Sequence, residues 1–98
     1  MPISTSQSNN ELIITLEEKF DFDSVEAFRK AYTDKHSKIY IIDFRNTEYM
    51  DSSGLGMLLN MKRYLAEYKN PPIRLINCRL QIKKILLISR FESKFIIT

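Results

Sequence analysis

Two adjacent serines at the start of a predicted helix are the residues of this chain best suited to chemistry. The stretch YMDSSGLGMLL places them between an aspartate and the chain's only two glycines: Asp51, Ser52, Ser53, Gly54 and Gly56. Aspartate and serine side chains accept hydrogen bonds from the free N–H groups of a helix start, each stabilising the helix by about 1 kcal/mol. Helix capping alone is therefore a sufficient reason for these residue types, and a chemical role for either hydroxyl needs further support.

The residues around the serines disfavour two kinds of chemistry. The G-L-G sequence lacks the third glycine of a dinucleotide-binding turn, and no lysine follows it as a P-loop requires. A nucleophilic serine needs a general base, but the single histidine, His36, lies at the opposite end of the strand predicted at 38–44. The motif also differs from the G-x-S-x-G elbow of hydrolases. We therefore predict that the protein is not an enzyme and carries no cofactor.

A serine here could instead be the substrate of a kinase. A hydroxyl at a strand-to-helix turn is exposed, and a neighbouring glycine leaves room for another protein to approach. A phosphate would lie on the free N–H groups and the positive end of the helix, so the fold would tolerate it. It would add about −1.5 to −2 charges beside Asp51, and a partner that fits the unmodified surface would meet repulsion and a desolvation cost. The sequence thus allows a phosphorylation switch that needs no change of fold.

The elements after residue 37 alternate between strand and helix, which predicts an α/β fold with a mixed, mostly parallel sheet and amphipathic helices. The nearly unbroken apolar run KIYIIDF is typical of a strand that is covered on both faces. The helix that begins at the serine motif extends to about Lys69, where N-P-P ends it. The remaining predicted elements are strands at 73–77 and 94–98 and a helix at 80–91.

The first third of the chain is predicted to hold a tail, two strands and a helix. Residues 1–10 are polar and read as a flexible tail, so the folded domain is expected at 11–98. The segments ELIITL and EEKFDF resemble a hairpin or a bent pair of strands. Asp23 is a plausible N-cap, with Glu26 three residues later, for a helix that ends near His36.

The helix behind the serine motif has an apolar arc that is wider than one buried side requires. At 100° per residue, one stripe is the natural core face: Leu55, Leu58, Leu59, Leu65 and Ala66. A second stripe beside it consists of residue types favoured at protein interfaces: Met57, Met61, Tyr64 and Tyr68. Two interpretations stay open for this second stripe, which either packs under a neighbouring helix or forms a partner-binding strip.

Composition limits the classes of function. Ninety-eight residues fit one domain, and no apolar run approaches the roughly 20 residues needed to span a bilayer. The start of the chain has no signal-peptide pattern, and Cys78, the lone cysteine, fits a reducing cytoplasm. One cysteine and one histidine disfavour a zinc site. Fifteen basic residues are interspersed with twelve acidic ones, which argues against nucleic-acid binding. We interpret Cys78 as a partly buried filler and His36 as exposed, whereas Asp43 could shape the Ser52 turn.

The segment IYIIDFRNTEYMDSSGLGMLL resembles the signature of STAS domains, and specifically of bacterial anti-sigma-factor antagonists. The resemblance extends over almost the whole chain and implies that Ser52 is the phosphorylated residue, with Ser53 as the second choice. It also implies that Asp51 shapes the turn and that Gly54, Leu55 and Gly56 form the helix start. Many members have a glycine in the second strand, where this chain has Glu17 and Glu18. The following acidic position, Asp21, is kept and is expected to contact the partner.

The resemblance also implies partners. In such systems an anti-sigma factor, itself a serine kinase of the histidine-kinase-like ATPase fold, phosphorylates the antagonist, and a PP2C-type phosphatase reverses the step. The unphosphorylated antagonist captures the anti-sigma factor and frees the sigma factor. The alternative is a STAS subunit of an ABC-type lipid-transport complex that docks on its ATPase without phosphorylation. We expect a cytoplasmic monomer or weak dimer without membrane insertion.

Overall fold

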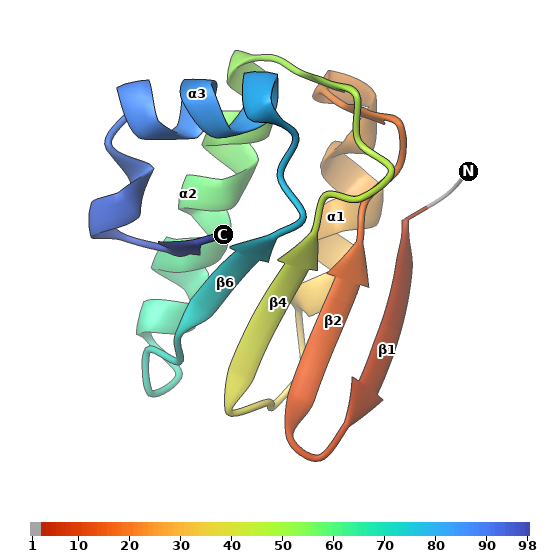
Figure 1. Ribbon diagram of the computed structural model, residues 1–98. Coiled ribbons are helices and arrows are strands. Elements are labelled where there is room, and N and C mark those ends of the chain that lie inside the picture. The colour runs from red at the N-terminus through yellow and green to blue at the C-terminus, as the bar shows by residue number, and fades with distance from the viewer. Residues whose placement is uncertain (1–2) are drawn as a thin grey trace.

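The computed structural model describes residues 3–98, which form seven strands, three α-helices and two short 3₁₀ helices. Figure 1 shows their arrangement. Their bounds in chain order are β1 (Ser4–Ser8), β2 (Glu11–Thr15), β3 (Lys19–Phe20), η1 (Phe22–Ser24), α1 (Val25–Tyr32), β4 (Ile39–Asp43), β5 (Tyr49–Met50), α2 (Ser52–Ala66), β6 (Ile73–Ile76), α3 (Leu80–Ile88), η2 (Phe91–Ser93) and β7 (Ile96–Ile97).

The main sheet is mixed and mostly parallel, as the sequence predicts. Its strands lie in the order β1-β2-β4-β6-β7, and only β1 is antiparallel to its neighbour (Figure 1). The predicted strands at 38–44, 73–77 and 94–98 are confirmed as β4, β6 and β7. The four parallel strands end at one edge of the sheet, and the connections to α2 and α3 leave from that edge, so the serine motif lies at the carboxyl ends of the strands.

The prediction of a flexible tail is wrong for residues 4–8, which form the edge strand β1. Asn9 and Asn10 have φ of 51° and 65° and join β1 to β2 in a two-residue hairpin. Asparagine tolerates this left-handed conformation, and such turns match the twist of antiparallel strands. Residues 1–2 of the expected tail lie outside the described residues.

Residues 11–22 form a bent pair of strands rather than a hairpin, so the hairpin, one of the two expected arrangements, is wrong. The partner of β2 in a hairpin is β1, whereas β3 turns away and pairs with β5 in a separate two-stranded parallel sheet. The register places Phe20 opposite Met50. This small sheet therefore connects the segment after β2 to the two residues that precede the serine motif.

The first helix begins and ends at residues other than those predicted. Asp21, not Asp23, is the cap: its Oδ1 accepts a hydrogen bond from the Asp23 N–H at 3.1 Å. The Ser24 hydroxyl in turn accepts one from the Asp21 N–H at 3.3 Å, which completes a capping box around η1. Helix α1 follows and ends at Tyr32 rather than near His36, because Thr33 leaves the helical conformation and its hydroxyl donates to the Arg29 carbonyl at 2.8 Å.

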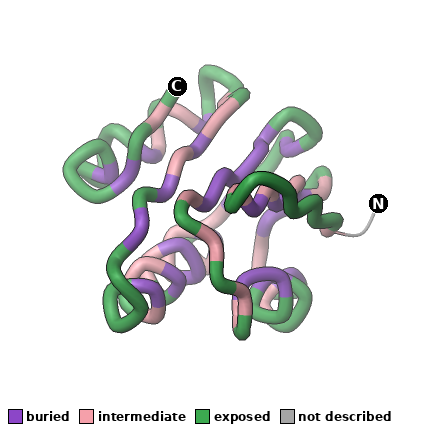
Figure 2. The backbone as a smooth tube through the Cα atoms, turned by 90° about the horizontal axis from the view of Figure 1, so that it is seen from below, coloured by how far each residue is buried: buried purple, intermediate pink, exposed green. Residues whose placement is uncertain are grey.

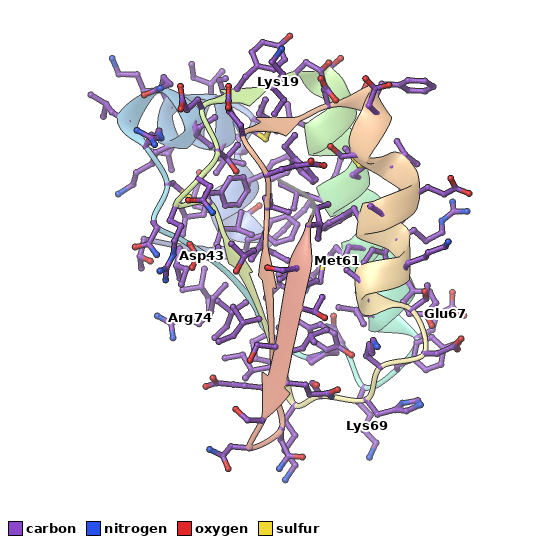
Figure 3. All side chains as sticks on the ribbon, turned by 90° about the vertical axis from the view of Figure 1, so that its right-hand side faces the viewer. Lys19, Asp43, Met61, Glu67, Lys69 and Arg74 are labelled. Carbon is purple, nitrogen blue, oxygen red and sulfur yellow. The ribbon has the colours of Figure 1, made fainter. Side chains whose placement is uncertain are left out.

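The helices cover both faces of the main sheet unequally. Helices α1 and α2 lie side by side against one face, and α3 lies toward the other (Figure 3). In Figure 2 the buried positions gather on the sides of helices and strands that face the middle of the molecule. Helix α3 contributes Ile82 and Leu86 to this core, and β4 contributes Tyr40 and Ile42.

The second stripe of α2 packs under a neighbouring helix, which is the first of its two interpretations, and the partner-binding strip is wrong for Met57 and Met61. Met57 and Met61 are 6% and 0% exposed, and Figure 3 shows Met61 between the sheet and the helices. Tyr64 is half-buried, with its ring centroid 5.5 Å from that of Tyr32 in α1. Only Tyr68 of this stripe is half-exposed. Met57 and Met61 therefore belong to the core and cannot contact a partner on the folded surface. Ala66, expected in the core, is exposed.

Candidate functional site

Ser52 is the first residue of α2, and its side chain is exposed. Among residues 3–98 no protein group forms a hydrogen bond with its hydroxyl. The hydroxyl of a serine that caps a helix accepts a hydrogen bond from a backbone N–H, whereas the Ser52 hydroxyl does not. The hydroxyl is therefore free for another reaction.

Asp51 performs the capping instead. Its Oδ1 accepts hydrogen bonds from the backbone N–H groups of Ser53 and Gly54 at 2.9 and 3.3 Å. The residue has the extended backbone that an N-cap adopts, with φ of −116° and ψ of −170°. Ser53 is half-buried beside it. The aspartate thus holds the helix start, and of the two serines Ser52 is the more accessible.

The two glycines of the motif serve different purposes. A Cβ on Gly54 would lie 2.5 Å from Met50 Cγ and 2.9 Å from the Phe20 carbonyl oxygen, so α2 can approach the small β3–β5 sheet only because this residue has no side chain. A Cβ on Gly56 would meet no atom within 4 Å. Gly54 is required for packing, whereas Gly56 keeps one face of the helix flat.

The exposed surface beside Ser52 consists of small and apolar groups. Residues three, four and seven positions after Ser52 lie on the same side of a helix, and we call this set the Ser52 face: Ser52, Leu55, Gly56 and Leu59. Leu55 and Leu59 are half-buried and pack on the core at their base. Two aromatic side chains on the neighbouring β5 and η1, Tyr49 and Phe22, are 50% and 74% exposed. This end of the molecule therefore offers more exposed apolar area than an ordinary polar loop.

Acidic side chains surround a hollow next to this surface. The hollow has a volume of about 410 Å³, and its lining includes four carboxylates that we call the acidic rim: Glu17, Glu18, Asp21 and Asp23. Lys19 is the one basic residue that lines it. The Glu18 carbonyl accepts hydrogen bonds from the Glu48 and Tyr49 N–H groups at 2.8 and 3.1 Å, which fixes the rim against the strand that leads into Asp51. Asp21, which is expected to contact a partner, also stabilises the structure as the N-cap of η1.

Asp43 does not shape the Ser52 turn as proposed from the sequence. It is 2% exposed, and its carboxylate accepts hydrogen bonds from the Arg45 N–H, the Arg45 Nε–H and the Asn77 Nδ2–H at 2.9, 2.7 and 3.0 Å. These bonds tie the end of β4 to the loop after β6. The carboxylate therefore organises the base of the segment that connects β4 to the motif.

The same connecting segment is held by residues that the sequence did not single out. The buried Thr47 donates its hydroxyl to the Glu17 carbonyl at 2.9 Å, and the Arg79 Nε–H donates to the Thr47 carbonyl at 3.0 Å. These residues are far apart along the chain, so local sequence patterns do not predict their contacts. The only sequence signal was a threonine among charged residues after a buried strand.

Replacing the buried carboxylate tests this connection. Asp43→Ala should lower the free energy of unfolding by about 1–3 kcal/mol, because it removes three hydrogen bonds that a buried carboxylate accepts from Arg45 and Asn77 and that tie β4 to the loop after β6. Arg45→Ala is the matched control and should cost less than about 1 kcal/mol, since its side chain is 63% exposed and the ion pair is partly screened. Urea unfolding followed by circular dichroism measures both. Equal effects of the two variants would contradict the central role of the carboxylate.

The remaining singled-out residues lie away from Ser52. His36 is exposed at the opposite edge of the sheet, beside the start of β4, so it cannot act as a base for Ser52. Burial raises the pKa of the half-buried Cys78 thiol to about 11, which makes it a weak nucleophile at neutral pH. Within residues 3–98 no group of three His, Cys, Asp or Glu side chains could hold a metal ion. Within the same range no helix has the length and apolar character to cross a bilayer.

The comparisons with known proteins agree on one family. A family model described as "Mlab, STAS domain" matches residues 3–97. A STAS-domain containing protein of Pseudomonas aeruginosa strain UCBPP-PA14 is 41% identical over 92 residues, covering 92% of this chain and 90% of that protein. Solved structures are similar at lower identity. The anti-sigma factor antagonist SpoIIAA of Bacillus, in its unphosphorylated form, has a TM-score of 0.74 at 22% identity and covers 98% of this chain and 86% of its own.

A second similar structure is that of an anti-sigma factor antagonist from Mycobacterium paratuberculosis, with a TM-score of 0.77 at 13% identity, covering 97% of this chain and 82% of that chain. At these identities the structural likeness establishes the fold. The family model and the Pseudomonas relative extend over nearly the whole sequence, including the Ser52 motif. The chain therefore belongs to the STAS domain family.

Proposed function

We propose that this protein is a partner-switching regulator whose unphosphorylated form binds an anti-sigma factor or a similar regulator. Phosphorylation of Ser52 by that partner, a serine kinase of the histidine-kinase-like ATPase fold, releases it. A PP2C-type phosphatase restores the binding form. In this proposal the protein works in the cytoplasm as a binding protein and has no catalytic activity of its own.

The observation that carries the proposal is the free hydroxyl of Ser52. Asp51 already caps the Ser53 and Gly54 amides, so the serine is exposed at a helix start without a structural hydrogen bond to lose. A kinase can reach such a hydroxyl without unfolding the helix. Ser53 is a weaker candidate because it is half-buried and its backbone N–H is bound to Asp51.

The solved relatives support a switch without a change of fold. SpoIIAA has been solved in a phosphorylated as well as an unphosphorylated form, and this chain resembles the two with TM-scores of 0.71 and 0.74. The fold of that protein accommodates a phosphate. A helix N-terminus with an aligned dipole is a favourable place for one.

The surroundings of Ser52 suggest how a phosphate would release a partner. The Ser52 face is flat and partly apolar, so a partner can exclude water from it, while the acidic rim favours basic residues on the partner at the edge of the contact. A phosphate adds about −1.5 to −2 charges at the centre of the contact, where it would have to be desolvated. Asp51 and the acidic rim add repulsion from the same side.

Phosphosite mapping tests the proposal. The protein, purified from its native cell, should carry a phosphate on Ser52 by mass spectrometry, and a Ser53→Ala variant should be phosphorylated to a similar extent. The Ser52→Ala variant, used as bait, should retain a protein with the sequence features of a histidine-kinase-like ATPase. Phosphate on Ser53 alone would contradict the assignment of the site. Co-purification with a transporter ATPase and no phosphate would instead support the lipid-transport alternative.

A further inference from the structure

A second hollow lies at the end of the molecule opposite Ser52. It has a volume of about 470 Å³ and lies between the α1–β4 and α2–β6 connections, next to the start of β4. Figure 3 shows Lys69, one of its residues, at the opposite end from Lys19, which lies in the small sheet beside the serine motif. The volume falls within the range of small-molecule sites, about 300–1,000 Å³. This hollow belongs to neither the Ser52 face nor the acidic rim.

The charge of the hollow has one sign. Three lysines and the single histidine line it, namely Lys35, Lys38, Lys69 and His36, and no aspartate or glutamate is among the lining residues. Three lysines that line one concave surface give it a positive potential. Such a site favours an anion with two charges over one with a single charge.

The walls of the hollow are apolar and held in place. Pro71 and Pro72 form one side, and the Pro72 carbonyl accepts the Tyr40 N–H at 3.0 Å. The buried Tyr40 donates its hydroxyl to the Lys35 carbonyl at 2.9 Å, which fixes the connection that carries two of the lysines. Tyr68 adds a half-exposed ring that packs on Tyr64 with a centroid distance of 4.9 Å. A flat apolar group can therefore lie on a preformed surface.

Lys69 occupies a backbone conformation that costs energy. Its φ is 73°, and the following Asn70 has φ of 45°. For a residue other than glycine the left-handed region costs roughly 1–2 kcal/mol, and asparagine tolerates it better than lysine does. Glycine would be the stable choice directly after a helix. Lys69 lines the hollow in this conformation, so the turn after α2 places a lysine there.

We propose that this hollow, the lysine pocket, binds a small phosphomonoester that carries a flat apolar group. The phosphate dianion would be held by Lys35, Lys38 and Lys69, and the apolar group would lie against Tyr68 and the two prolines. The proposal does not depend on phosphorylation of Ser52, because the two sites lie at opposite ends of α2.

Titration with phenyl phosphate, followed by ¹H–¹⁵N correlation spectra of the full-length protein, tests the pocket. Amide signals of residues 35–38 and 68–70 should shift in a saturable way, while those of residues 52–56 stay unchanged. Inorganic phosphate should bind several-fold more weakly, because it lacks the apolar group. Equal affinity for the two probes, or shifts spread over all surface lysines, would overturn the proposal.

Two variants separate binding from folding. Lys38→Gln should weaken phenyl phosphate binding about fivefold, as expected for the loss of roughly 1 kcal/mol of attraction between two charges near a water-exposed surface. Lys69→Gly should weaken it similarly and at the same time raise the melting temperature, since it relieves the left-handed lysine. Lys84→Gln, an exposed charge on α3, is the control and should bind as the wild type does. Wild-type affinity in both pocket variants would also overturn the proposal.

Discussion

Ser52→Glu should weaken binding of the partner kinase by about 100-fold, a loss of about 2.7 kcal/mol, while Ser52→Ala should bind as tightly as the unphosphorylated protein. The alanine variant loses no hydrogen bond, because the Ser52 hydroxyl makes none within residues 3–98. The glutamate places one full charge where a phosphate would place up to two. Isothermal titration calorimetry with the partner retained by the Ser52→Ala bait measures both affinities.

The loss of binding should occur without a loss of stability. A carboxylate in the first turn of a helix interacts favourably with the helix dipole, by about 0.3–1 kcal/mol, so Ser52→Glu should unfold at the same temperature as the wild type or slightly above it. This separates the switch from damage to the fold. A variant that bound weakly because it was partly unfolded would show a lower melting temperature.

Asn60→Glu provides the matched control. Asn60 is exposed in the middle of the same helix, and its side-chain oxygen accepts a hydrogen bond from Arg63 at 3.2 Å, a role that a glutamate can keep. The control adds the same charge to α2 outside the Ser52 face and should reduce affinity less than about threefold. If Ser52→Glu and Ser52→Ala bound the partner equally well, the charge at Ser52 would not be the switch. If Asn60→Glu were as damaging as Ser52→Glu, net charge rather than position would be responsible.

The parts of the fold that the sequence predicts are those that depend on neighbouring residues. The apolar run of β4 and the aspartate before the serines each give a local signal, and each element lies where that signal places it, whereas α2 ends at Ala66, before the end near Lys69 that the proline pair predicts. The edge strand β1 gives no such signal. All five of its residues, STSQS, are exposed, and it owes its conformation to backbone hydrogen bonds with β2 rather than to an apolar pattern.

Some features of the candidate site also follow from the local sequence, and others depend on contacts between distant residues. The cap at Asp51 follows from residue type and position, whereas the reason for Gly54 depends on Phe20, which is distant along the chain and reaches it through the β3–β5 pair. Helical periodicity places Met57 and Met61 on one side of α2 but does not say what covers that side. Helix α1 covers it, and this depends on how the two helices pack.

Gly54→Ala should lower the free energy of unfolding by about 1–3 kcal/mol, whereas Gly56→Ala should raise it by about 0.5–1 kcal/mol. Both residues lie in the first two turns of α2, so the change in helix propensity is similar. They differ in what a methyl group would meet. At position 54 it would lie 2.9 Å from a backbone carbonyl of β3, which cannot move without displacing the small sheet, and at position 56 it would meet no atom within 4 Å.

Thermal unfolding of the two variants measures this difference. For a domain of this size a change of 1 kcal/mol shifts the melting temperature by about 4–8 °C, so the variants should melt on opposite sides of the wild type. Because Met50 directly precedes Asp51, a displaced β3–β5 sheet should also move the cap, and Gly54→Ala should bind the partner more weakly. A Gly54→Ala variant as stable as Gly56→Ala would mean that Met50 and the small sheet yield at no cost. The close approach at Gly54 would then not be what positions Ser52.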